Sequence, residues 1–250
     1  MGVYWKMLIV FDCESYLFRA CSACKTLKQD ARDRFIYTES YDLRKGMDYI
    51  NNVVLDLQQR FLTNDIVFVV GDKNNWRKQY AEDYKANRKD KDKPIMYDLI
   101  LNEVYNKYDV VSLPNLEADD TCRIINEDNQ NYPTRKVLVS IDKDFKTFPC
   151  ELYDPLHDKH QVINKADADY NLMKQIIMGD KADNYNGLAG YGEVKATKFM
   201  DDEPRIMEDV KQLFYEAGQL NDFKKNLNLA SIVSLERYDF NTGKVKEITL

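Results

Sequence analysis

The sequence predicts an α/β fold in which a twisted parallel sheet is flanked by helices. Three short segments, 7–11, 66–70 and 136–141, are almost wholly apolar and rich in β-branched residues, as buried strands are. Such unbroken apolar character is typical of parallel strands, because helices pack against both faces of their sheet. Segments of helical periodicity lie between these strands, and that alternation is the pattern of a parallel α/β fold.

The first half of the chain supplies most of the predicted elements. Residues 15–24 and 46–62 carry apolar side chains at close to helical spacing. An amphipathic helix opened by a proline is predicted for 94–108, followed by a strand at 110–113. The polar stretch 28–42 is predicted to be a loop.

The second half has weaker patterns. A helix is predicted to begin at Glu117, and two weaker strands near Leu152 and Val162 precede a helix at 170–178. The tail, 201–250, is expected to begin helical and to become mixed afterwards. Its residues suggest no chemistry.

Three aspartates mark the ends of predicted strands. Asp12, Asp72 and Asp142 each fall at the carboxyl end of one of the apolar segments. Open α/β sheets bind their ligands at that edge, so we expect these side chains to face one site. One aspartate after a strand is ordinary turn chemistry, but the repetition favours a functional site over surface charge.

Further acidic residues belong to the same pattern. Glu117, Asp119 and Asp120 stand where a helix should begin. The others are Asp144, which is close to Asp142, and the pair Asp180 and Asp183. Two carboxylates about 4 Å apart repel by ~4 kcal/mol at an effective dielectric constant near 20. A fold that gathers several needs cations, so the sequence predicts a divalent metal site.

The charge is unevenly distributed. The chain has 250 residues, 44% hydrophobic content and a net charge of −6, which allows a real core. Segment 73–93 nevertheless holds eight basic residues against four acidic ones. It is either a solvated loop or a mobile basic segment over the site, with aromatic residues interleaved as in single-strand binders. The acidic total therefore does not exclude a nucleic-acid partner.

The sequence predicts a cytoplasmic protein. No run is long and apolar enough to span a membrane, and the first residues lack the features of a signal peptide. The five cysteines are an odd number and are expected to be buried or free thiols. Cys21 and Cys24 form a CxxC without the second pair or histidine cluster of a zinc site.

A glycine-rich turn follows the last acidic pair. Gly187, Gly190 and Gly192 are three of only nine glycines in the chain, which indicates a specific backbone conformation. A glycine hairpin entering a helix at Glu193 would offer backbone amides to a phosphate. A simple turn remains the alternative.

Five motifs stand in an order that resembles a known family. They are FDCESYLFRA, VFVVGD with WRKQYAEDYKANR, LEADD, SIDKDF, and GDKADN with GLAGYGEVKA. Between Asp12 and about Phe199 the chain resembles the 5′ nucleases: bacteriophage 5′-3′ exonucleases, flap endonucleases and the 5′ nuclease domain of bacterial DNA polymerase I. The resemblance implies a PIN-like α/β core at 1–165, with a basic helical arch at about 73–93. It also implies a helical region at 166–250 with a helix-hairpin-helix motif.

The resemblance also implies the roles of individual residues. The first metal ion would be held by Asp72, Glu117, Asp119 and Asp120, with Asp12 behind them, and the second by Asp142, Asp144, Asp180 and Asp183. Lys85 and Arg88 resemble the residues that contact the scissile phosphate, and Asp72 and Asp142 would be catalytic carboxylates. The implied DNA contacts are Arg19, Arg77, Tyr84 (stacking an unpaired base), Lys85, Arg88, Gly187, Gly190, Gly192 and Lys195.

The implied activity is structure-selective hydrolysis of DNA at 5′ ends or 5′ flaps, with removal of RNA primers during replication. Two or more Mg²⁺ ions are implied, with Mn²⁺ as a substitute, since the ligands are all oxygen; a K⁺ ion is implied at the hairpin. The expected partners are DNA and RNA–DNA hybrids, with no membrane, and the expected state is a monomer. The alternatives are a PIN-type ribonuclease and a non-catalytic binder of branched DNA.

Overall fold

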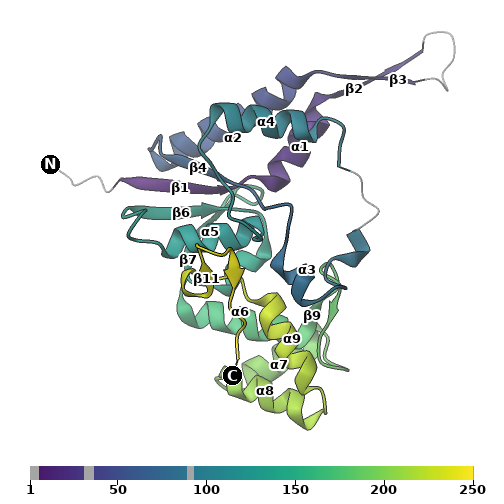
Figure 1. The fold of residues 1–250 in the computed structure, drawn as a ribbon, viewed down its shortest axis with the longest axis vertical. Helices are drawn as coiled ribbons and strands as arrows, with labels where there is room; N and C mark the ends of the chain where they lie inside the picture. The colour runs from purple at the N-terminus through teal and green to yellow at the C-terminus, as the bar shows by residue number, and fades with distance from the viewer. Residues whose placement is uncertain (1–5, 31–36, 89–92, 250) are drawn as a thin grey trace.

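The computed structural model describes residues 6–30, 37–88 and 93–249. Its centre is a six-stranded sheet in the order β5-β4-β1-β6-β7-β8 (Figure 1). The strands are β1 (Met7–Asp12), β4 (Ile66–Val69), β5 (Val110–Val111), β6 (Arg135–Val139), β7 (Cys150–Asp154) and β8 (Lys159–Ile163). The first five are parallel and β8 pairs antiparallel with β7 at one edge. The predicted parallel sheet is confirmed, with one antiparallel edge strand added.

Helices cover both faces of this sheet. The helices α1 (Glu14–Cys24), α2 (Leu43–Phe61) and α4 (Tyr97–Lys107) pack on one face, and α5 (Ala118–Glu127) and α6 (Lys165–Met178) contribute to the core on the other. Phe11 points into the first core and its neighbour Val10 into the second, and both are fully buried. Because successive strand residues face opposite sides, a strand covered on both faces must be apolar throughout.

A second group of helices lies below the sheet in Figure 1. It contains α7 (Glu193–Asp202), α8 (Met207–Glu216) and α9 (Leu220–Ala230), which share a core with α6. Between α6 and α7 lies the short ribbon of β9 (Gly179–Asp180) and β10 (Tyr185–Asn186). The chain then returns to α5 through a 3₁₀ turn and the ribbon of β11 (Tyr238–Asp239) and β12 (Lys244–Val245).

The loop predicted for 28–42 is wrong. The strands β2 (Lys25–Gln29) and β3 (Tyr37–Tyr41) pair antiparallel, and Figure 1 shows this ribbon extending away from the rest of the fold. Residues 31–36 lie outside the described residues. Most side chains of the ribbon are exposed, so the sequence carries no alternation of apolar and polar residues to reveal it.

The basic segment is packed rather than solvated. It forms the short helix α3 (Trp76–Tyr80) and a 3₁₀ turn at Ala86–Arg88, while 89–92 lie outside the described residues. Trp76, Arg77 and Tyr84 are 7%, 1% and 3% exposed. The solvated-loop interpretation is therefore wrong for 73–88. In the other interpretation, a mobile basic segment over the site, Trp76 and Tyr84 are not exposed rings as in a single-strand binder, and the mobility of the segment stays a prediction.

None of the described helices is both long and apolar enough to cross a membrane. The five cysteines are all buried and unpaired, as predicted, and Cys21 and Cys24 contribute only to the core beside α2.

Candidate active site

A cleft of about 620 Å³ opens at the carboxyl edge of the sheet. Its walls include Asp12, Glu117, Asp119 and Asp142, together with Lys85, Arg88, Glu14, Ser15, Phe18, Ala118, Ile141 and Lys143. Four predicted metal ligands therefore meet where the strand ends were expected to bring them together. Both cations predicted to contact the scissile phosphate lie in the same cleft.

The ends of β1 and β6 are joined by a serine that the sequence analysis did not single out. The Ser140 hydroxyl donates to Asp12 Oδ2 at 2.7 Å and accepts from the backbone N–H of Asp142 at 3.0 Å. Burial raises the pKa of Asp12 to about 7, and the hydrogen bond from Ser140 only partly offsets this. Asp12 is therefore a carboxyl group that gains or loses a proton near neutral pH unless a cation approaches it.

The start of α5 carries the second part of the cleft. Ligand atoms of Glu117, Asp119 and Asp120 lie within 4.8 Å of one another. Burial opposes ionisation of Glu117, but the charges of Lys85 and Arg77 outweigh it and lower the pKa of Glu117 to about 2. Burial and the neighbouring carboxylates raise the pKa of Asp119 well above its usual range. The charges of Arg77 and Lys85 only partly offset this rise.

Three further acids, Asp144, Asp180 and Asp183, lie beside the cleft rather than in its walls. Burial and the charge of Asp142 raise the pKa of Asp144 to about 7. Asp180 accepts from Lys143 Nζ at 2.9 Å and from the backbone N–H of Ala182 at 2.7 Å. These contacts place the predicted second cluster next to the first, with Lys143 between them.

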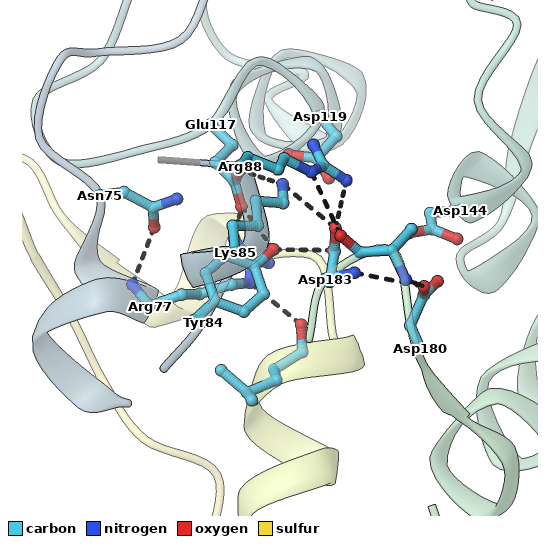
Figure 2. Close-up of polar contacts among 12 residues, drawn as sticks. Asn75, Arg77, Tyr84, Lys85, Arg88, Glu117, Asp119, Asp144, Asp180 and Asp183 are labelled. Atoms are coloured by element: carbon cyan, nitrogen blue, oxygen red, sulfur yellow. Dashed lines mark hydrogen bonds and ion pairs between the residues drawn. The ribbon is translucent and has the colours of Figure 1, made fainter. Parts of the chain in front are cut away.

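The basic segment closes one side of the site (Figure 2). Lys85 Nζ donates to Glu117 and lies 3.8 Å from Asp183 Oδ1, and Arg88 Nη2 donates to Asp183 Oδ1 at 2.7 Å. The Tyr84 hydroxyl lies 2.9 Å from Glu117 Oε2 and 3.0 Å from Asp183 Oδ2. Through these contacts, residues 84–88 link Glu117 of the first predicted metal cluster with Asp183 of the second.

Two predicted DNA contacts are contradicted by burial. Tyr84 is 3% exposed and hydrogen-bonded on the site side, so its ring is not available to stack an unpaired base. Arg77 is 1% exposed and donates to Asp120 through two nitrogens, at 2.6 and 2.8 Å. Its guanidinium therefore neutralises a carboxylate inside the protein and does not reach a phosphate.

Asp120 does not fit its predicted role as a metal ligand. It is fully buried, and both of its oxygens accept hydrogen bonds from Arg77. Asp72 stands at the end of β4, but its oxygens accept from the backbone N–H groups of Lys73 and Asn115 at 2.7 and 2.8 Å. It does not line the cleft, and its metal role stays a prediction.

Arg19 lies apart from the acidic cleft. It lines a separate groove of about 870 Å³ between α1, α2 and the turn after β7, together with Tyr16, Tyr49 and Tyr153. Its predicted phosphate contact is therefore not part of the cleft and stays a prediction.

Several residues of the cleft were not predicted from the sequence. Phe18 is 45% exposed in its wall, which offers an apolar face to a base. Glu14 Oε1 accepts from the backbone N–H of Gly71 at 2.9 Å, which ties α1 to the end of β4. Lys143 could have been found from its place between two aspartates in SIDKDF.

The three glycines of the turn before α7 differ in their surroundings. Gly190 has φ +77°, a conformation that favours glycine. Gly187 has no room for a side chain, because backbone atoms of Ile177 and Met178 would lie 2.2 Å from a Cβ. Gly192, the residue before α7, has ordinary φ and open space around it. Lys195 is one turn into α7, close to Gly190.

The donor set of the cleft fits a hard divalent cation. The candidate ligands are carboxylate oxygens, without an accompanying cysteine or histidine in the cleft wall, and Mg²⁺ and Mn²⁺ prefer such ligands. Burial and neighbouring carboxylates raise the pKa of Asp119, and a bound cation would stabilise the charged form of such a group.

A parallel sheet with a carboxylate cleft at its carboxyl edge and basic residues across it is an arrangement suited to metal-dependent hydrolysis of phosphodiesters. Residues 7–172 match the family model described as the 5′-3′ exonuclease, N-terminal resolvase-like domain. The chain belongs to this 5′-3′ exonuclease family and is a 5′ nuclease.

Two phage proteins and one solved structure illustrate the relationship. The chain is 31% identical to the exodeoxyribonuclease of Enterobacteria phage T3 over 83% of its own length and 70% of that protein. It is 30% identical to the exonuclease of Escherichia phage T7 over 75% of its length and 65% of that protein. The fold is similar to the bacteriophage T5 flap endonuclease in a pseudo-enzyme-product complex with DNA and metal ions, with a TM-score of 0.67, 14% identity, and coverage of 91% and 89% of the two chains.

Proposed function

We propose that this chain uses divalent metal ions to hydrolyse phosphodiester bonds of DNA at 5′ ends and 5′ flaps. The observation that carries the proposal is the cleft, in which Asp12, Glu117, Asp119 and Asp142 face Lys85 and Arg88. The names of the phage relatives, exodeoxyribonuclease and exonuclease, support the reaction.

Mg²⁺ is the metal proposed, with Mn²⁺ as a substitute. One group of ligands is Asp12, Glu117 and Asp119, to which Asp72 can be added by rotation of its side chain; the other is Asp142, Asp144, Asp180 and Asp183. When bound, two such ions activate a water molecule and stabilise the leaving oxygen of the phosphodiester.

The chain's own residues contribute binding, orientation and charge. Lys85 is held by Glu117 in the cleft wall and Arg88 by Asp183 beside the cleft, so their positive charges are preorganised for a phosphate whose charge grows in the transition state. Phe18 offers its exposed ring to the base next to the scissile bond. Ser140 keeps Asp12 and the turn of Asp142 in fixed relation.

The proposed domains are a nuclease core at 1–165 with its basic arch, and a helical region at 166–250 that grips duplex DNA. The turn of Gly187, Gly190 and Gly192 precedes α7, and Lys195 lies in the first turn of that helix. Backbone N–H groups at a helix start bind phosphates. A K⁺ ion at this turn is part of the proposal. So are RNA–DNA hybrids as substrates, a monomeric state, and action in the cytoplasm of an infected bacterium, which the phage origin of the relatives supports.

A cleavage assay tests the proposal. A flap duplex labelled at its 5′ end is incubated with wild type or Asp142→Asn, with Mg²⁺ or with EDTA. Short labelled fragments only with wild type and Mg²⁺ are expected. Cleavage by Asp142→Asn at the wild-type rate would remove the cleft from the mechanism, and tight binding without cleavage in any metal would favour the non-catalytic alternative.

Two substrate controls sharpen the result. A blunt duplex without a flap separates exonuclease from flap activity, and single-stranded RNA of the same sequence tests the ribonuclease alternative. Preference for single-stranded RNA would contradict the proposal even if Asp142 is essential.

A further inference from the structure

The most deeply buried ion pair around the site is formed by Arg77 and Asp120. Arg77 Nη1 donates to Asp120 Oδ2 at 2.6 Å and Arg77 Nη2 donates to Asp120 Oδ1 at 2.8 Å. Asp120 Oδ2 also accepts from Trp76 Nε1 at 3.4 Å and from the backbone N–H of Glu117 at 3.3 Å. The side chains of Arg77 and Asp120 are 2% and 0% exposed.

The C-terminal segment 229–235 completes this pair. Arg77 Nε donates to the carbonyl of Leu229 at 3.0 Å and Nη2 to the carbonyl of Ser231 at 3.1 Å. The backbone N–H of Val233 donates to Asp120 Oδ1 at 2.8 Å. A segment far along the chain thereby supplies two acceptors to the cation and one donor to the anion.

The same segment is bound to α5 further along the helix. Arg123 Nη1 donates to the carbonyl of Ile232 at 2.8 Å, and Glu127 Oε2 accepts from the backbone N–H of Leu235 at 2.8 Å. The segment thus lies along α5 and contacts α3 at Arg77. Glu117 stands at the start of α5, and α3 leads along the chain to Lys85.

We infer that Asp120, Arg77 and segment 229–235 form a positioning unit and that Asp120 is not a metal ligand. This inference rests on the proposed function for its metal site. Arg77 also donates to Glu117 Oε2 at 3.1 Å, so the unit fixes the cleft carboxylate directly. Trp76 and Arg77 begin α3, from which the chain continues to Tyr84 and Lys85.

The contacts of neighbouring acids explain why the roles differ. Both oxygens of Asp120 are directed at donors inside the protein, so a metal ion could reach them only after a buried ion pair is broken. Asp119 accepts from the backbone N–H of Asp120 at 2.8 Å and lines the cleft. Adjacent positions in LEADD therefore separate into one residue that faces the cleft and one that holds the scaffold.

Removing one partner of a buried pair leaves the other charged and unpaired, whereas replacing both with apolar residues is often neutral. The test compares Asp119→Asn, Asp120→Leu, Arg77→Met and the double variant Arg77→Met/Asp120→Leu. Mn²⁺ binding without DNA is measured by calorimetry, and unfolding is followed by the melting temperature. Each single variant at the pair is expected to lower Tm by roughly 10 °C, and the double variant to recover at least about half of that loss.

Metal binding distinguishes the two roles. Asp119→Asn is expected to weaken Mn²⁺ binding by about tenfold or more, and the double variant to bind as many Mn²⁺ ions as wild type with affinity within about threefold. A folded double variant that loses one Mn²⁺ ion, or whose Mn²⁺ affinity falls as far as that of Asp119→Asn, would overturn the inference. So would strictly additive losses of Tm, because an isolated pair of unrelated residues gives that result.

Kinetics test whether the unit positions the site. The double variant is expected to lose about tenfold in kcat with KM within about twofold, because the donor to Glu117 is gone and no group on the substrate has changed. The matched control is Arg135→Met, which breaks an arginine–carboxylate pair with Glu151 on strands β6 and β7, outside the cleft lining; its kcat should stay at the wild-type value. An equal loss of kcat in Arg135→Met would refute a specific role for Arg77 and Asp120. If wild type bound Mn²⁺ but failed to cleave, the proposed function would fall while the metal and Tm comparisons still decided the inference.

Discussion

Replacing Lys85 with methionine should change metal binding and cleavage in opposite directions. Lys85 Nζ donates to Glu117 and lies 3.8 Å from Asp183 Oδ1, and its side chain is 18% exposed. At an effective dielectric constant near 20, unit charges at that separation attract by ~4 kcal/mol. The lysine therefore acts as a counter-ion within the acidic site, and a metal ion must compete with it for the same carboxylates.

The expected gain in metal affinity follows from this attraction. If only a third of the ~4 kcal/mol is released in Lys85→Met, Mn²⁺ binding to the free protein tightens by about tenfold. Methionine keeps the apolar stem of the lysine, so the surrounding packing should survive. Cleavage should nevertheless slow by about 100-fold, because a fixed cation opposite the reacting phosphate is lost.

Calorimetry with Mn²⁺ and single-turnover cleavage of a 5′ flap measure the two effects. The control is Lys225→Met, which removes a cation 2.9 Å from Asp83, outside the cleft, and should alter neither quantity. A variant of Lys85 that binds Mn²⁺ no tighter than wild type would refute the counter-ion argument. One that cleaves at the wild-type rate would refute its role at the phosphate.

Three other outcomes follow from the geometry. The pKa values of Asp12 and Asp144 are raised from 3.8 to about 7, so their stabilising effect is complete below about pH 4 and is lost as pH rises to about 7. Their contribution to the metal-free Tm should therefore fall between about pH 4 and about pH 7 and level off above that range, and Mg²⁺ should raise Tm more at about pH 7 than at about pH 5. Tyr84→Phe removes the hydroxyl between Glu117 and Asp183, so kcat on a flap should drop by about tenfold with little change in KM, whereas an unchanged kcat would make the hydroxyl dispensable. Gly190→Ala forces a side chain into φ +77° at a cost of about 1 kcal/mol. Filter binding should show weaker affinity for duplex DNA than in the control Gly192→Ala, because the φ of Gly192 needs no glycine. Equal affinities would exclude a role for the backbone of this turn in DNA binding.

The sheet and the acidic cleft were accessible from the sequence because both depend on short-range pattern. Strands buried on both faces must be apolar throughout, and parallel strands end at one edge. Those two rules place Asp12 and Asp142 in one cleft, but they predict the same for Asp72, which instead accepts hydrogen bonds from two backbone N–H groups beyond β4. The start of α5 was equally visible, since acidic residues at a helix N-terminus are stabilised by the helix dipole.

Other features depend on contacts that leave no recognisable pattern in the sequence. The ribbon of β2 and β3 is held by backbone pairing with both faces largely exposed, so no hydrophobic period marks it. Its register is supported at one end by the ion pair of Lys25 with Glu39, which looks like ordinary surface charge in the sequence. Phe18 does belong to a hydrophobic pattern, but that pattern misleads, because an aromatic residue in an amphipathic helix is usually part of a core.

Arg77 shows most clearly how a resemblance in sequence can mislead about a role. An arginine inside a basic segment of a DNA enzyme is a natural candidate for phosphate binding. Its partners, however, are Asp120 and the carbonyls of Leu229 and Ser231, and the last two lie in a tail to which the sequence assigned no chemistry. The net charge of a segment predicts binding to a polyanion only if its charged side chains are exposed in the folded protein. In this chain Lys85 and Arg88 line the cleft while Arg77 stabilises the wall behind it, so burial, rather than charge, separates the residues that act on substrate from the one that holds them in place.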